Sequence, residues 1–265
     1  MTLQKKIIYA IRAAVKSGEI LIKNYSEEKK FRIKSKFNRD VYTRIDIESE
    51  NEILKILKKD QKQPANFLFE ENGYLEFYKN SKFTWIIDAL DGTVNYIHKI
   101  PYFCTSIALK DNESNKIIFG VIYNPLSSEL YYSHLDGSVF KNANKVYIDD
   151  NPISKSLIAI SLSSNHTKEK NNELQIFKKL NFASQGVLRT GSAGMNLAYF
   201  SEGKFSACIG FENKIWDVAS GLILAEKNGA KIYYKYKNKK KTIISFIVAN
   251  KNNYQTIYDI CKKII

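Results

Sequence analysis

The sequence predicts a two-lobed protein with a meandering antiparallel sheet in its first lobe and alternating strands and helices in its second. The first observation is a series of short apolar segments, separated by Asn, Asp, Gly and Pro, between residues 65 and 133. The second is the change of pattern after Pro152, where helical and strand-like segments alternate. With 265 residues, 44% of them hydrophobic, the chain is long enough for two packed lobes, 1–150 and 151–265.

The first lobe begins with an expected amphipathic helix. Apolar residues recur at three- and four-residue steps from Leu3 to Tyr25. A Lys-rich stretch at 29–39 is interpreted as a solvated loop, and a second helix is expected at 46–58. The expected strands then follow at 66–69, 83–87, 103–109, 117–123 and 130–133.

The second lobe is expected to alternate strands with helices. Gly229 is placed to end the last of these helices, since glycine commonly follows a helix C-terminus. The basic run 235–241 lies between two apolar strands and is interpreted as a hairpin tip. The expected elements are strand 157–162, helix 171–180, helix 194–201, strand 205–209, helix 216–228 and strands 230–234 and 243–248.

Composition excludes several classes of protein. The formal net charge is +14, but the lysines are spread along the chain, which favours a solvated surface over a nucleic-acid site. No apolar run approaches the ~18 residues of a membrane span, and the N-terminus shows no signal peptide. The three cysteines lack metal-binding spacing. We therefore expect a cytoplasmic protein without membrane association.

The stretch from Trp85 to Tyr96 carries the strongest chemical signal. Asp88 and Asp91 follow an apolar strand, and oxygen ligands at this spacing can hold Mg²⁺. The N–H groups of Gly92 and Thr93 come next and can receive a phosphate. The same run is also compatible with an ordinary turn, because Asp and Gly favour turns for local reasons.

Two distant features support the metal-site interpretation. Glu70 and Glu71 follow another apolar strand, so paired carboxylates are expected at a second strand end. Asp217 opens a predicted helix, where the helix dipole favours a negative charge. A simple capping role remains the alternative for Asp217.

Three blocks, in order, resemble the inositol monophosphatase family of Mg²⁺-dependent, Li⁺-sensitive sugar phosphatases. Residues 85–96 are similar to its Trp-x-x-Asp-Pro-Ile-Asp-Gly-Thr-x-Asn-Phe motif, and residues 216–221 to its Trp-Asp-x-Ala-x-Gly motif. Residues 189–193 resemble its substrate-side glycine loop. Val94-Asn95-Tyr96 favours the inositol phosphatase branch over the 3′-phosphoadenosine phosphatase branch. The resemblance implies a layered α-β-α-β-α sandwich and a homodimer.

The resemblance also implies a site for two to three Mg²⁺ ions. Glu70, Asp88 and the carbonyl of Leu90 would hold the first ion. Asp88, Asp91 and Asp217 would hold the second, and Glu70 with water a weaker third, near the Lys-rich loop. A shared carboxylate at Asp88 offsets the repulsion between two neighbouring cations.

The implied reaction is in-line attack of a metal-activated water on a phosphate monoester. Glu70 and Thr93 would orient and deprotonate that water, with Asp46 behind Thr93. Residues 40–46 resemble the family's Asp-x-x-Thr-x-x-Asp segment, which gives Asp46 this role. A helix N-cap is an equally good and compatible role for Asp46.

The substrate side departs from the family pattern. Gly210 stands where inositol-cleaving members usually carry a Glu, six residues before Trp216, and Glu212 lies two residues later. Ala89 replaces the motif's proline, which predicts a slightly looser turn. The expected phosphate and substrate contacts are Asp91, Gly92, Thr93, Gly191, Ser192, Ala193 and Glu212.

The resulting expectation is a Mg²⁺-dependent phosphomonoesterase that acts on a small sugar or polyol phosphate such as inositol 1-phosphate. Other enzymes of this family use fructose 1,6-bisphosphate, nucleotide bisphosphates, NADP or histidinol phosphate, and these substrates stay open. A third alternative is a role in binding a transcription complex, because some bacterial members bind RNA polymerase or antitermination complexes.

Overall fold

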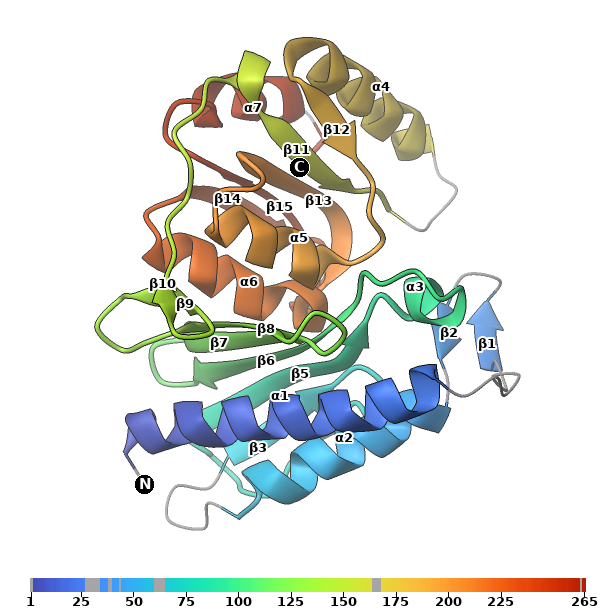
Figure 1. Ribbon diagram of the computed structural model, residues 1–265, viewed down its shortest axis with the longest axis vertical. Helices are drawn as coiled ribbons and strands as arrows, with labels where there is room; N and C mark the ends of the chain where they lie inside the picture. The colour runs from blue at the N-terminus through green and yellow to red at the C-terminus, as the bar shows by residue number, and fades with distance from the viewer. Residues whose placement is uncertain are drawn as a thin grey trace.

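The protein folds into five layers, in the order helix, sheet, helix, sheet, helix (Figure 1). The structure is a computed structural model. It describes residues 2–26, 34–37, 40–42, 44–59, 65–163, 168–262 and 264–265. The predicted layered sandwich is therefore confirmed. None of the helices in these ranges combines the length and the apolar character that a membrane crossing requires.

The first sheet has eight strands in the order β10-β9-β8-β7-β6-β5-β3-β4. Strand β3 runs parallel to β5, and every other neighbouring pair is antiparallel. All nine residues of β5 are buried, because helices cover both faces of the sheet at this strand. The strands are β3 (Ala65–Phe69), β4 (Tyr74–Leu75), β5 (Phe83–Asp91), β6 (Cys104–Asp111), β7 (Lys116–Asn124), β8 (Glu129–Ser133), β9 (Val139–Lys141) and β10 (Asn144–Lys145).

Two helices, α1 (Leu3–Tyr25) and α2 (Arg44–Leu57), cover the outer face of this sheet (Figure 1). Ile7 and Ala14 of α1 and Ile53 of α2 are buried in one core with the sheet residue Phe119. This packing uses the apolar stripe that predicted α1. Between the two helices in the sequence, β1 (Lys34–Phe37) lies within the segment expected to be a loop and pairs antiparallel with β2 (Asp40–Tyr42), which follows that segment. The rest of that segment lies outside the described residues.

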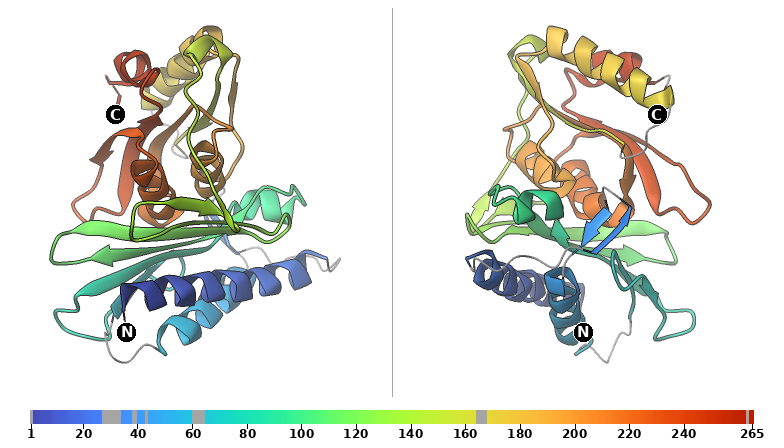
Figure 2. Two further views of the ribbon diagram at one scale, coloured as in Figure 1. Left: turned by 60° about the vertical axis from the view of Figure 1, so that its left-hand side comes forward. Right: turned by 90° about the vertical axis from the view of Figure 1, so that its right-hand side faces the viewer.

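The second sheet has five strands in the order β12-β11-β13-β15-β14. Strands β12, β11 and β13 are parallel, and β15 is antiparallel to both of its neighbours. Helices α4 and α7 cover its outer face, and α5 and α6 lie between the two sheets (Figure 2). The elements are β11 (Leu157–Ser161), α4 (Lys168–Ala183), β12 (Gly186–Leu188), α5 (Ala193–Ser201), β13 (Ala207–Lys214), α6 (Ile215–Lys227), β14 (Lys231–Tyr236), β15 (Ile243–Ala249) and α7 (Tyr254–Cys261), after a 3₁₀ turn at Ile153–Lys155.

Helix α6 packs very closely on the first sheet. A Cβ atom added at Gly120 of β7 would lie 2.6 Å from the carbonyl oxygen of Ser220. Ser106 of β6 bonds the same helix, with its hydroxyl 2.8 Å from the hydroxyl of Ser220. This close approach holds α6 against β6 and β7, and β6 is the neighbour of β5 in the sheet.

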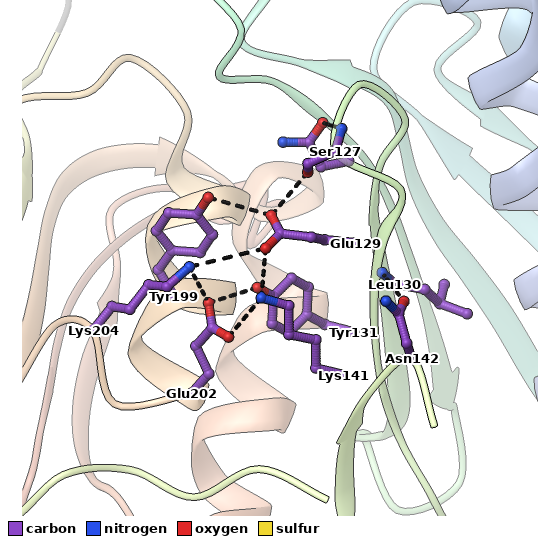
Figure 3. Close-up of polar contacts among 10 residues, drawn as sticks. Ser127, Glu129, Leu130, Tyr131, Lys141, Asn142, Tyr199, Glu202 and Lys204 are labelled. Carbon is purple, nitrogen blue, oxygen red and sulfur yellow. Dashed lines mark hydrogen bonds and ion pairs between the residues drawn. The ribbon is translucent and has the colours of Figure 1, made fainter. Parts of the chain in front are cut away.

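A polar network joins the β8–β9 hairpin to the end of α5 (Figure 3). Lys141 lies 2.5 Å from Glu129 and 2.8 Å from Glu202, and Lys204 lies 2.6 Å from Glu202. The Tyr131 hydroxyl donates to Glu202 at 2.7 Å. Burial raises the pKa of Glu129, but hydrogen bonds from Lys141 and Ser127 outweigh burial and hold that pKa below its usual value. The network therefore ties the first sheet to the middle helical layer.

The structure corrects several sequence-based boundaries. Strand β5 was expected to end before Asp88, yet it continues through an irregularity in its pairing with β6 to Asp91, which pairs with Cys104. Helix α2 begins at Arg44, so Asp46 lies in its first turn and is not the N-cap. The sequence analysis missed β4, β9, β10, β12, the short helix α3 (Thr93–Ile97) and α7, most of them too short to show a periodic pattern.

Candidate active site

Three carboxylates from three elements meet beneath the N-terminus of α6. Glu70 follows β3, Asp88 lies in β5 and Asp217 lies in the first turn of α6. One oxygen of each carboxylate lies within 4.8 Å of the others. The parallel pairing of β3 with β5 explains why Glu70 and Asp88 are neighbours. Phe69 and Ile87 are in register, so the residues that follow them lie side by side.

The electrostatics of this cluster favour a positive partner. Burial, followed by the charges of neighbouring carboxylates, raises the pKa of Glu70 and Asp88 well above the usual range. Burial and the charge of Asp91 do the same for Asp217, although the Lys214 ammonium opposes the shift. Hard oxygen donors that repel one another at this separation suit a divalent cation such as Mg²⁺. The donor set therefore fits the ion that the sequence predicts.

The backbone after Asp88 folds back on its own side chain. The N–H of Leu90 donates to Asp88 Oδ1 at 2.8 Å, which leaves Oδ2 without this bond. The carbonyl oxygen of Ala89 accepts from the Thr105 hydroxyl at 2.9 Å. That bond holds the peptide at the position where the family motif has proline.

Asp91 is oriented toward the loop before α5. Its Oδ2 accepts hydrogen bonds from the Ser192 hydroxyl and the Gly194 N–H, both at 2.6 Å. Burial raises the pKa of Asp91 to about 6 despite these bonds. Asp91 is not part of the group of three carboxylates. The second ion's ligand set, with Asp91 in it, stays a prediction.

Thr93 and Asp46 lie together at the start of α3. The Thr93 hydroxyl lies 3.0 Å from the carbonyl oxygen of Leu90 and 3.4 Å from Asp46 Oδ1, and Asp46 is buried. Gly92 precedes Thr93 with φ +96°, a left-handed conformation that strains other residues. The structure thus brings together the pair that the sequence predicts.

Asn95 holds the glycine loop in place, a role that the sequence analysis missed. Its amide nitrogen donates to the carbonyl oxygens of Thr190, at 2.9 Å, and Tyr102, at 2.7 Å. A Cβ atom added at Gly191 would lie 2.8 Å from that nitrogen. Ser192 then caps α5 by accepting from the N–H of Met195 at 3.2 Å. Asn95 lies inside the motif of residues 85–96, and this position was the signal from which its role could have been predicted.

The side chains of Phe246 and Asn213 fill the space beside Gly210. An added Cβ atom would lie 2.2 Å from both Phe246 Cε1 and Asn213 Oδ1. The pairing of β13 with β15 is irregular between Gly210 and Asn213, and Glu212 within this bulge has φ +52°. The N–H of Glu212 donates to the Ser245 hydroxyl at 3.0 Å. A glutamate at position 210 would therefore have to displace the Phe246 ring and the Asn213 amide.

Asp217 serves the helix as well as the carboxylate cluster. Its Oδ2 accepts from the backbone N–H of Lys214, the N-cap residue of α6, at 3.3 Å. The capping role that the sequence offered as an alternative is therefore present. The second oxygen of the side chain remains to face Glu70 and Asp88.

A five-layered α/β fold with buried carboxylates between its two sheets is the architecture of a metal-dependent sugar phosphatase. The model of the inositol monophosphatase family matches residues 3–264, and the chain belongs to this family. The resemblance stated from the sequence motifs is thereby confirmed.

The relatives of this chain carry different names. An inositol-1-monophosphatase of Caulobacter vibrioides is 32% identical, over 84% of this chain and 86% of the relative. A fructose-1,6-bisphosphatase/inositol-1-monophosphatase of Aquifex aeolicus is 28% identical over 98% and 97% of the two chains. A Nus factor SuhB of Haemophilus influenzae is 31% identical over 83% and 82%. The crystal structure of the extragenic suppressor protein suhB from Bartonella henselae superposes on this chain with a TM-score of 0.87 at 27% identity. The match spans 98% of this chain and 99% of the Bartonella chain.

Proposed function

We propose that this protein is a Mg²⁺-dependent phosphomonoesterase that hydrolyses a small sugar or polyol phosphate. The observation that carries the proposal is the meeting of Glu70, Asp88 and Asp217 within 4.8 Å, beside the Thr93–Asp46 pair. These carboxylates, with the Leu90 carbonyl and Asp91, would hold two to three Mg²⁺ ions. Bound there, Mg²⁺ would offset phosphate charge and lower the pKa of an attacking water.

The chain's own residues would position the reactants. In this proposal Thr93 donates its hydroxyl hydrogen to Asp46, so its oxygen is free to accept a hydrogen bond from the attacking water. Glu70 would take the proton that this water loses. The N–H groups of Gly92 and Thr93, at the start of α3, would bind phosphate oxygens, since the first N–H groups of a helix lack partners within the helix.

The substrate side supports a broad specificity. Gly210 carries no carboxylate to bond an inositol hydroxyl, and Phe246 and Asn213 occupy the space that a side chain there would need. Asp91 and the 191–193 loop would contact the alcohol, together with Glu212. A site without a dedicated hydroxyl partner discriminates less between alcohols. Fructose 1,6-bisphosphate, nucleotide bisphosphates, NADP and histidinol phosphate remain candidates beside inositol 1-phosphate.

The test is phosphate release by the purified chain from each of these compounds, in Mg²⁺, in a chelator and after Mg²⁺ is restored. We expect activity to disappear in the chelator and to return with Mg²⁺. Full activity in the chelator would contradict the metal-dependent mechanism. A preference for inositol 1-phosphate of a hundredfold or more, in kcat/KM, would contradict the proposed breadth, since that factor is about 2.7 kcal/mol of discrimination.

A second candidate function is binding to a transcription complex. The similarity to a protein named Nus factor SuhB supports it. A pull-down with a variant that lacks the carboxylate cluster separates this function from catalysis. Recovery of transcription proteins would support the second function, and recovery of none would contradict it. We also propose that the protein is cytoplasmic and that it is a homodimer. Sedimentation analysis of the purified chain would test the homodimer, and cell fractionation would test the location.

A further inference from the structure

A cavity lies between the two sheets, apart from the residues of the candidate active site. Its volume is about 820 Å³, within the range of small-molecule sites. It is lined by the β3–β7 part of the first sheet, by α6 and by the β14–β15 hairpin. Figure 2 shows that hairpin extending beside the same end of the first sheet in both views.

The interior of this cavity is aliphatic. Ten of its lining residues are Ala, Leu or Ile, and Ile86, Ile215, Ile223 and Ile244 among them are nearly fully buried. The tyrosines Tyr74 and Tyr234 also line it but are about half exposed, at 55% and 52%. The buried surface therefore suits a hydrocarbon chain better than a flat polar ring.

The polar lining of the cavity is strongly basic. Lys110, Lys116, Lys240 and Lys241 line it, against a single acidic residue, Glu226. Among the described residues, no carboxylate forms an ion pair with any of these four lysines, although Lys241 lies 5.7 Å from the ring of Tyr236. Burial and the charge of Lys241 together lower the pKa of Lys110. The lysines repel one another, and an anion would relieve this repulsion.

We propose that this cavity binds an amphiphilic anion, an unbranched aliphatic chain that ends in a carboxylate. The chain would lie against the isoleucines of β5, α6 and β15, and the carboxylate would lie between Lys110 and Lys241. A neutral lipid would leave the lysines uncompensated. A polyphosphate would leave the aliphatic interior exposed to water. The proposal does not depend on the phosphatase activity.

The position of the cavity connects it to the carboxylate cluster. Leu68, Ile86 and Ile215 line it, and each lies two residues before one of the three clustered carboxylates, Glu70, Asp88 and Asp217. A bound chain would therefore pack against β3, β5 and the first turn of α6.

The test is calorimetric titration of the full chain with octanoate, decanoate and dodecanoate below the concentrations at which they form micelles. We expect saturable binding that tightens with chain length by up to about fourfold per methylene, the factor that burial of one methylene allows. Dodecyltrimethylammonium has the same chain with a positive head group and should bind at least tenfold more weakly. Equal binding of the two amphiphiles, or absence of saturable binding, would overturn the proposal.

Four variants, one of them a control, locate the site. Lys110→Ala and Lys241→Ala should each weaken dodecanoate binding about tenfold, which is the loss of about 1.4 kcal/mol. Lys239 lies in the same hairpin tip but outside the cavity lining. The Lys239→Ala variant is therefore the control and should bind dodecanoate as tightly as the unaltered protein does. Ala230→Phe adds a ring to the lining and should abolish binding while circular dichroism shows an intact fold. Dodecanoate affinity unchanged in Lys110→Ala, Lys241→Ala and Ala230→Phe would overturn the assignment.

Discussion

At the scale of single residues, Asp88 and Asp217 contribute unequally to the proposed metal site. Asp88 would bridge two ions, whereas Asp217 would bind one and also caps α6. We expect Asp88→Asn to lower kcat/KM at least tenfold more than Asp217→Asn at saturating Mg²⁺. The physical reason is loss of stabilisation from two cations, on the order of several kcal/mol. Steady-state kinetics of phosphate release measures the difference.

Asp259→Asn is the matched control for this comparison. Asp259 lies in α7, and its partners Lys262 and Gln255 are exposed neighbours in the same part of the chain. The kcat/KM of the Asp259→Asn variant should stay within about twofold of that of the unaltered protein, since exposed ion pairs contribute little to stability. Equal losses in Asp88→Asn and Asp217→Asn would show that Asp88 does not bridge.

Glu50 predicts a pH dependence of stability. Burial raises the pKa of Glu50 to about 7, although the N–H groups of Glu71 and Asn72 donate to its carboxylate. Because the folded protein disfavours the charged form, the contribution of Glu50 is greatest below its unfolded pKa. It falls as pH rises from about 4 to about 7, by on the order of 3 kcal/mol.

The measurement is urea unfolding of the protein and of Glu50→Gln at several pH values between 4.5 and 7.5. The free energy of unfolding of the unaltered protein, minus that of Glu50→Gln, should decrease as pH rises. A difference that stays constant or grows across this range would contradict the raised pKa.

At the scale of elements, Lys141 joins the β8–β9 hairpin to the end of α5 through Glu129 and Glu202. Removing its charge leaves two largely buried carboxylates with fewer positive partners. We expect Lys141→Met to lower the free energy of unfolding by about 1–3 kcal/mol, the cost of leaving buried polar groups without partners. Urea unfolding measures this loss. Lys155→Met, at an exposed position, should change stability by no more than about 0.5 kcal/mol. A loss in Lys141→Met no larger than the control would contradict the role of the network.

Long elements were readable from the sequence, and short ones were not. The 23-residue helix α1 shows its apolar stripe over several turns, so its bounds were predicted correctly. The five residues of α3 complete barely more than one turn, and hydrogen bonds with distant segments hold the helix in place. Strand β5 continues past Ile87 because Asp88 pairs with Ser106 and Asp91 with Cys104, and both partners lie in another strand.

At the scale of the whole molecule, the sequence predicted which residues meet but not how they are arranged. The order of Glu70, Asp88 and Asp217 in the family motifs brought all three into one site. It did not show that Ser192 and Gly194 occupy one oxygen of Asp91. Nor did it show that Phe246, from another strand, closes the space at Gly210. Such contacts depend on the packing of segments that are distant in sequence.

Inhibition by Li⁺ tests the assembled second ion site. Asp88, Asp91 and Asp217 would form that site, and the bond from Thr105 holds the backbone at Ala89. We expect LiCl to inhibit phosphate release more strongly than NaCl or KCl at the same ionic strength, because general salt screening affects all three alike. Dose–response curves that coincide for the three salts would contradict the proposed second site.

The two-residue spacing in sequence between lining residues of the aliphatic cavity and the clustered carboxylates has a thermodynamic consequence. Leu68, Ile86 and Ile215 belong to the same short segments as Glu70, Asp88 and Asp217, so an occupant and a cation would act on one set of backbone positions. Linkage then requires reciprocity. Any factor by which dodecanoate changes the affinity for Mg²⁺ equals the factor by which Mg²⁺ changes the affinity for dodecanoate.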